Sequence, residues 1–103
     1  MSIGNADIAE QARELAEAYI GTGDRELAAI AAALYKGDDA SMRESAHTLK
    51  GASANLRASA AISAASQLEA AAGSGESTQI AALAGKLKSE IERTIEYLQS
   101  KVA

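Results

Sequence analysis

The chain has one histidine, His47, and its imidazole is the side chain best suited to chemistry. Imidazole is the side chain that ordinarily changes between neutral nucleophile and cation near physiological pH. Arg43 and Lys50 stand one helical turn to either side of it, and Arg57 is expected on the same flank. These cations disfavour imidazolium and favour an anion on or beside the ring, as phosphorylation would supply. The alternative is a solvated basic strip on an acidic protein.

The residues that follow the histidine lack bulk. Gly51 lies one turn from His47 on the outward side, and Ala54 lies one turn further along. A glycine inside a helix costs about 0.5–1 kcal/mol relative to alanine, and nothing in the local pattern indicates a helix end at Gly51. We expect either that a partner approaches closely over Gly51 and Ala54, or that the helix bends or packs tightly against a neighbour there.

The segment that carries His47 is predicted to be a helix that begins at Asp38-Asp39. Its apolar stripe recurs at spacings of three and four and should face the core: Met42, Ala46, Leu49, Ser53 and Leu56. At about 100° per residue, His47 lies about 140° away from this stripe. The imidazole is therefore expected to face solvent.

The rest of the chain is predicted to be helical as well. The expected helices run from Asn5 to Gly21, from Asp24 to Lys36, from about Ser59 to Gly73 and from about Ser77 onward, and Gly21-Thr22-Gly23 separates the first two. Short loops make sequential helices antiparallel neighbours. The predicted fold class is all-α: an antiparallel up-and-down four-helix bundle with an additional N-terminal helix, forming one domain over residues 1–103.

Composition narrows the classes of function. Cysteine is absent, which excludes disulfides, cysteine metal sites and thiol nucleophiles. The formal net charge of -4 gives no attraction for nucleic acid or for an anionic membrane surface, so we expect protein partners. No apolar run approaches the roughly 20 residues that span a bilayer, and the first residues, Met1 to Asn5, lack the basic region and the hydrophobic stretch that an export signal has. A cytoplasmic location is expected.

The run from His47 to Ala58, HTLKGASANLRA, resembles the signature of histidine-containing phosphotransfer domains, which is His-x-Leu-Lys-Gly followed by small residues and a Leu-Gly-Ala-like end. Ala46, Gly37-Asp38 and Leu68-Glu69-Ala70 also stand where such domains tend to have similar residues, so the resemblance covers roughly residues 24 to 100. The chain departs from the pattern at Arg57, where the family usually has glycine. The upstream segment also has alanine and leucine where many members have phenylalanine.

The resemblance implies roles for the matching residues. His47 is the expected phosphoacceptor, Lys50 stabilises the phosphoryl group, and Gly51 leaves room for a receiver domain. The partner-binding surface is expected to include Arg43, Gly51, Ala54 and Arg57, together with Gln67 and Glu69 from the next helix, which orient the ring or its water.

The implied reaction is a transfer between histidine and aspartate. Neutral His47 attacks the phosphoryl group of a phosphoaspartate on a response-regulator receiver domain, and the reverse step loads a second receiver. We expect no cofactor and no metal site in this chain, because Mg²⁺ belongs to the receiver's carboxylates. The chain has no phosphate-binding loop of the form G-x-x-x-x-G-K-[ST], so it is expected to be a monomeric phosphocarrier and not an ATP-dependent enzyme.

Other functions fit parts of the sequence. The dimerising bundle of a sensor kinase would have an acidic residue after the histidine and a proline at the end of its motif, whereas Thr48 follows His47 and proline is absent. A phosphoacceptor module cut from a chemotaxis-type or hybrid sensor kinase is not separable from a free-standing carrier, since a histidine or hybrid sensor kinase is an expected donor in both. A helical scaffold in which His47 is incidental is the remaining alternative.

Overall fold

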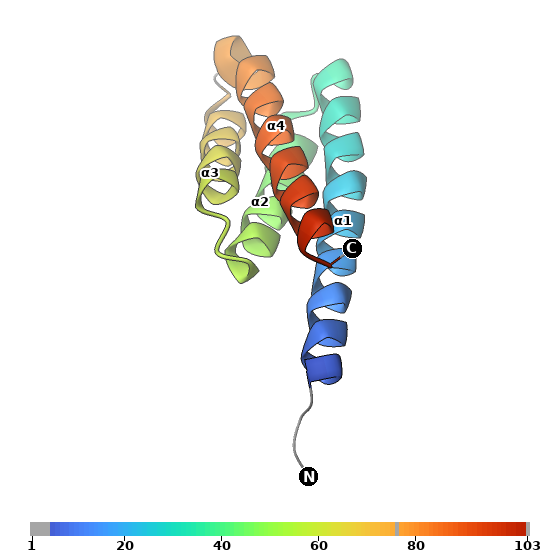
Figure 1. Ribbon diagram of the computed structural model, residues 1–103. Helices are drawn as coiled ribbons and strands as arrows, with labels where there is room; N and C mark the ends of the chain where they lie inside the picture. Colours follow the sequence, from blue (N-terminus) through green and yellow to red (C-terminus); the bar gives the residue numbers. More distant parts are fainter. Residues whose placement is uncertain (1–4, 76, 103) are drawn as a thin grey trace.

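The computed structural model describes residues 5–75 and 77–102. These residues form four helices and no strand: α1 (Asn5–Lys36), α2 (Asp39–Asn55), α3 (Ser59–Ser74) and α4 (Ser77–Val102). α1 packs against α2 and α4, and α3 packs against the same two helices, so the four helices form an up-and-down bundle (Figure 1). The predicted all-α class is confirmed, and α3 and α4 begin at the predicted serines.

The predicted additional N-terminal helix is wrong, because α1 is one unbroken helix of 32 residues. The expected break at Gly21-Thr22-Gly23 lies in its interior. Gly23 is buried against α4, where an added Cβ would lie 3.1 Å from Ile91 Cγ2 and 3.2 Å from Ile95 Cδ1. Glycine therefore allows α1 and α4 to approach closely, and this packing offsets its helix cost of about 1 kcal/mol.

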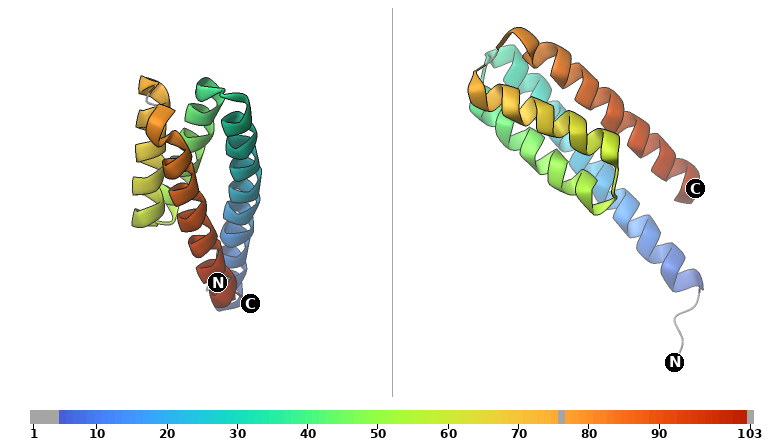
Figure 2. Two further views of the ribbon diagram at one scale, coloured as in Figure 1. Left: turned by 90° about the horizontal axis from the view of Figure 1, so that it is seen from above. Right: turned by 90° about the vertical axis from the view of Figure 1, so that its left-hand side faces the viewer.

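The first turns of α1 extend beyond the ends of α2 and α3 (Figures 1 and 2). Ile8 and Leu15, two large apolar residues of these turns, are 57% and 48% exposed. The bundle is elongated for this reason, with extents of 55 × 18 × 17 Å. Burial along α1 begins at Ala16 and Tyr19, and it is this later part of the helix that packs in the bundle.

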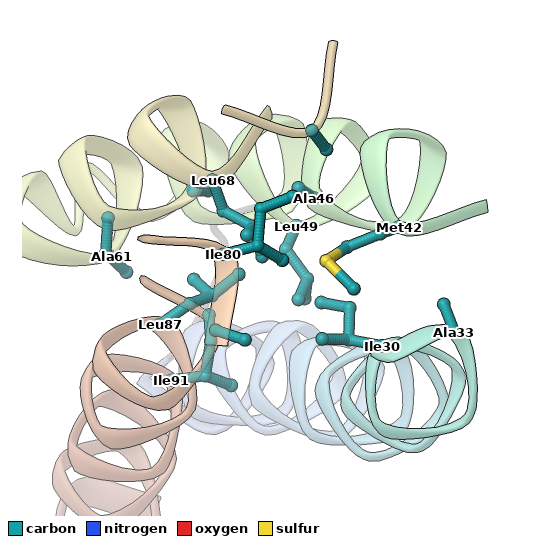
Figure 3. Packing of buried hydrophobic residues seen from close by; sticks show 14 of the residues in the cluster. Ile30, Ala33, Met42, Ala46, Leu49, Ala61, Leu68, Ile80, Leu87 and Ile91 are labelled. Carbon is teal, nitrogen blue, oxygen red and sulfur yellow. The ribbon is translucent and has the colours of Figure 1, made fainter. Parts of the chain in front are cut away.

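Side chains from all four helices meet in one core (Figure 3). Leucine and isoleucine fill its centre, and alanines from each helix let the backbones approach closely. The predicted stripe of α2 is buried at Met42, Ala46, Leu49 and Ser53, and Leu56 at its end is half-buried. A buried hydrogen bond of 2.9 Å between the Tyr19 hydroxyl and Ser53 Oγ links α1 to α2 in the core.

Local signals fix the two ends of α2. Asp38 caps its N-terminus as predicted, since its carboxylate accepts a hydrogen bond from the Ser41 backbone N–H at 3.1 Å. The Ser41 hydroxyl, which donates to the other carboxylate oxygen at 2.6 Å, holds the pKa of Asp38 below its usual range, and the capping bond adds to this effect. The helix ends at Asn55, and Arg57 follows in a left-handed conformation with φ of 55°. These ends place His47 midway along α2.

Candidate functional site

His47 lies on the seam between α2 and α3, which run antiparallel. Across this seam His47 faces Glu69, and one turn earlier on α2 Arg43 faces Gly73. The His47 side chain is 67% exposed, so the predicted solvent-facing imidazole is confirmed. Since α2 is rooted in the core by Ala46 and Leu49 on its opposite face, the position of the ring is set by a buried stripe.

Glu69 binds two of the predicted site residues at once. One of its oxygens, Oε2, lies 2.8 Å from His47 Nδ1, and the other, Oε1, lies 2.7 Å from Lys50 Nζ. The Glu69 side chain is 18% exposed and the Lys50 side chain is 35% exposed, so both are partly buried. Glu69 of α3 thus bridges His47 and Lys50 of α2, and the three side chains form one cluster.

The charge of Glu69 determines which imidazole nitrogen is free. The Lys50 ammonium beside Glu69 holds the pKa of this carboxyl below its usual range, and the hydrogen bond to His47 adds to this effect. A carboxylate only accepts hydrogen bonds, so in the neutral ring we assign the proton to Nδ1. Nε2 then has an unshared electron pair, as a nucleophile requires.

Two open hollows flank the cluster, and Arg43 lines both. One, of about 380 Å³, includes His47, Glu44 and Glu69, and the other, of about 540 Å³, includes Lys50, Glu69 and Gly73. Arg43 lies directly against Gly73, where an added Cβ would be 3.4 Å from Arg43 Nε and 3.5 Å from Arg43 Cδ. The structure therefore places Arg43 and Glu44 beside the histidine, in addition to Lys50 and Glu69.

Gly51 and Ala54 lie on an open surface of α2. Both residues are exposed, and a Cβ added to Gly51 would meet no described atom within 4 Å outside its own helix backbone. The alternative that Gly51 packs tightly against a neighbouring helix is therefore wrong, and α2 continues through it without a break. The free space that a docked partner needs is present.

Two predicted site residues lie apart from this cluster. Arg57 follows the end of α2, ten residues after His47, and lines a separate hollow with Arg93 and Tyr97. The expectation that Arg57 shares the histidine's flank is wrong, because the helix ends before it. Gln67 is exposed and its amide donates to Ser63 Oγ at 3.2 Å, so in this conformation it does not orient the ring.

The structure adds residues that sequence reasoning did not single out. Ser66, Ala70, Gly73 and Ser74 on α3 line the larger hollow. Their three- and four-residue spacing around Glu69 places them on one helical face, which was the available signal. The antiparallel register that brings this face to His47 required the structure.

Within residues 5–75 and 77–102, no three histidine or acidic side chains gather where they could hold a metal ion. None of the described helices is long and apolar enough to cross a bilayer.

Comparison with known families agrees with this geometry. A family model described as "Hpt domain" matches residues 6–100, nearly the whole chain. No curated protein and no solved structure matches this chain. An exposed histidine midway along one helix of a bundle, followed by a lysine and an open glycine, is the arrangement that the sequence resemblance implied. The chain belongs to the Hpt domain family, whose members carry out histidine phosphotransfer in two-component phosphorelays.

Proposed function

We propose that His47 is the phosphoacceptor and that it exchanges a phosphoryl group with the aspartate of a receiver domain through Nε2. The observation that carries this proposal is the contact of 2.8 Å between His47 Nδ1 and Glu69 Oε2, because it leaves Nε2 unprotonated on an exposed ring. Glu69 acts as a positioning residue, since it holds the tautomer and the ring orientation without touching the phosphoryl group.

The transfer step balances without a cofactor in this chain. His47 Nε2 attacks the phosphorus of the receiver's acyl phosphate, the N–P bond forms, and the P–O bond to the aspartate breaks. The aspartate leaves as a carboxylate, which the receiver's Mg²⁺ would hold. The proton stays on His47 Nδ1, which continues to donate it to Glu69. The reverse step loads a second receiver.

Lys50 supplies positive charge to the phosphoryl oxygens. Its ammonium is 2.7 Å from Glu69 Oε1 and has two further N–H groups to donate. Gly51 and Ala54 supply the bare surface over which the receiver's backbone docks, and Arg43 lines the hollows beside His47. We propose that the chain acts as a monomeric, cytoplasmic phosphocarrier of one domain over residues 1–103, loaded by a kinase or a receiver and without an ATP site of its own.

The test uses a receiver domain that carries radiolabelled phosphate on its aspartate. When this receiver is mixed with the chain, the wild-type protein should become labelled and the His47→Gln protein should not. Lys50→Ala should slow the transfer while leaving the helical circular-dichroism spectrum unchanged, since its side chain is not part of the core. Equal labelling of wild type and His47→Gln would overturn the proposal, and so would labelling of another residue by peptide mapping.

A further inference from the structure

Two cations, Arg43 and Lys50, and two carboxylates, Glu44 and Glu69, border the hollows beside His47. Lys50 is paired with Glu69 at 2.7 Å, whereas Arg43 forms no ion pair with any residue that the structure describes. A dianionic phosphoryl group on His47 would stand close to the Glu69 carboxylate, which repels it. A cation that is not already engaged by a carboxylate is what this arrangement needs.

Arg43 has the position to supply that charge. It stands one helical turn before His47 on the same face of α2, and both residues line the hollow of about 380 Å³. Lys50 stands one turn after His47, so the two cations lie on opposite sides of the ring along the helix. Arginine also donates through a planar fork that matches two phosphoryl oxygens at once.

Gly73 is what lets Arg43 lie there. The Arg43 Nε and Cδ atoms rest 3.4 and 3.5 Å from where a Cβ of residue 73 would be. A larger side chain at position 73 would occupy the space of the guanidinium stem and lift it from α3. Gly73 lies in the last turn of α3, which ends at Ser74, and its lack of a side chain leaves the Arg43 stem in contact with the helix surface.

We propose that Arg43, seated on Gly73, is a second phosphoryl-binding residue, which contacts the phosphoryl group on His47 Nε2 from the side opposite Lys50. This inference rests on the proposed function of His47. It assigns Arg43 to the phosphoryl group itself, and not only to the docking of a partner protein.

The experiment avoids any partner protein by using phosphoramidate, a small phosphoryl donor. The phosphoryl group passes from phosphoramidate nitrogen to His47 Nε2, and ammonia leaves. After the donor is removed, ³¹P NMR follows two properties of the phosphohistidine: its half-life as water attacks phosphorus and the N–P bond breaks, and the pH midpoint of its chemical shift. A bound cation favours the dianion, so it lowers that midpoint.

Arg43→Ala should shorten the half-life by about two- to fivefold, the effect of one exposed charge contact, and should move the midpoint to higher pH. Arg43→Lys should retain part of both effects. Gly73→Leu should behave like Arg43→Ala although it removes no charge. The matched controls are Arg93→Ala and Gly85→Leu, which change an exposed arginine and an open helical glycine on α4 and should leave both properties as in the wild type.

The outcomes separate the two proposals. If phosphoramidate labels His47 and Arg43→Ala leaves the half-life and the midpoint at wild-type values, Arg43 does not hold the phosphoryl group and this inference is wrong. The inference also fails if Arg43→Ala slows only the transfer from a receiver, because the arginine then contacts the partner. If His47 takes no label from phosphoramidate or from a receiver, it is the proposed function that fails.

Discussion

Glu69 is the residue on which the site's geometry depends, and its ion pair makes a testable contribution to stability. Lys50 lowers the pKa of Glu69 below the ordinary value of 4.5, so the carboxylate is stabilised by the folded state. That contribution is fully present above about pH 4.5 and is lost as the pH falls through the lower pKa of the folded protein. Glu69→Gln should therefore reduce the free energy of unfolding at pH 7 by about 0.5–1 kcal/mol.

Urea titrations at pH 7 and at pH 3 measure this difference. The two proteins compared both carry His47→Gln, which removes the imidazole from the comparison and leaves the pair between Lys50 and Glu69. The difference in unfolding free energy between the protein that retains Glu69 and the one with Glu69→Gln should shrink toward zero at pH 3. A difference that stays constant or widens in acid would show that the ion pair does not lower this pKa.

Among the residues that the structure describes, Arg57 is the non-glycine residue whose φ is positive. It stands at a position where the family usually has glycine. A residue with a Cβ pays about 1 kcal/mol for the left-handed conformation, which glycine adopts freely. Arg57→Gly should therefore be more stable than Arg57→Ala by about 1 kcal/mol in thermal or urea unfolding. The alanine variant is the matched control, since both variants lose the charge and only glycine relieves the strain. Equal stability of the two variants would contradict the assignment.

At the scale of the element, the two glycines inside α1 have different surroundings. Gly21 meets nothing within 4 Å, whereas Gly23 faces Ile91 and Ile95 of α4. Gly21→Ala should stabilise the protein by about 0.5–1 kcal/mol through helix propensity. Gly23→Ala should destabilise it by about 1 kcal/mol, because Ile91 is fully buried and cannot move aside without strain. Urea unfolding of the two variants against wild type measures both signs, and stabilisation by both would show that α1 and α4 are not closely packed.

The same two glycines explain where the prediction of elements failed. Helix existence follows from spacing, because Met42, Ala46 and Leu49 recur on one face whatever packs against them. Helix ends follow from local chemistry where the cap is in the sequence, as at Asp38. Gly23 could end a helix or could allow a second helix to pack closely against it. Which of the two occurs depends on Ile91, 68 residues away, and no local pattern contains that information.

At the scale of the whole molecule, some features of the site follow from one helix and can be predicted from the sequence, whereas others depend on how two helices pack. The exposure of His47 and its nearness to Lys50 depend only on the phase of α2, which the sequence supplies. The bridge from Glu69 to both of them depends on the register between α2 and α3, and so does the seating of Arg43 on Gly73. Arg57 was misplaced because its position was inferred from helical phase, and the helix ends two residues before it.

The elongated shape predicts an uneven distribution of local stability along α1. Its residues 8–15 are all exposed and extend past α2 and α3, whereas the later turns pack against α2 and α4 (Figure 2). An isolated helical segment of this length is marginal in water, so these turns open without unfolding the bundle. Amide hydrogen exchange should be fast at residues 8–15 and slow around Tyr19 and Ile30, within the same continuous helix.

The exchange measurement also tests the proposed monomer. If a second copy covered Ile8 and Leu15, their amides would become protected as protein concentration rises. Exchange that is fast and independent of concentration over residues 8–15 agrees with a monomer whose first helix projects into solvent. Slow exchange over these residues at low concentration would contradict the exposed placement of this segment.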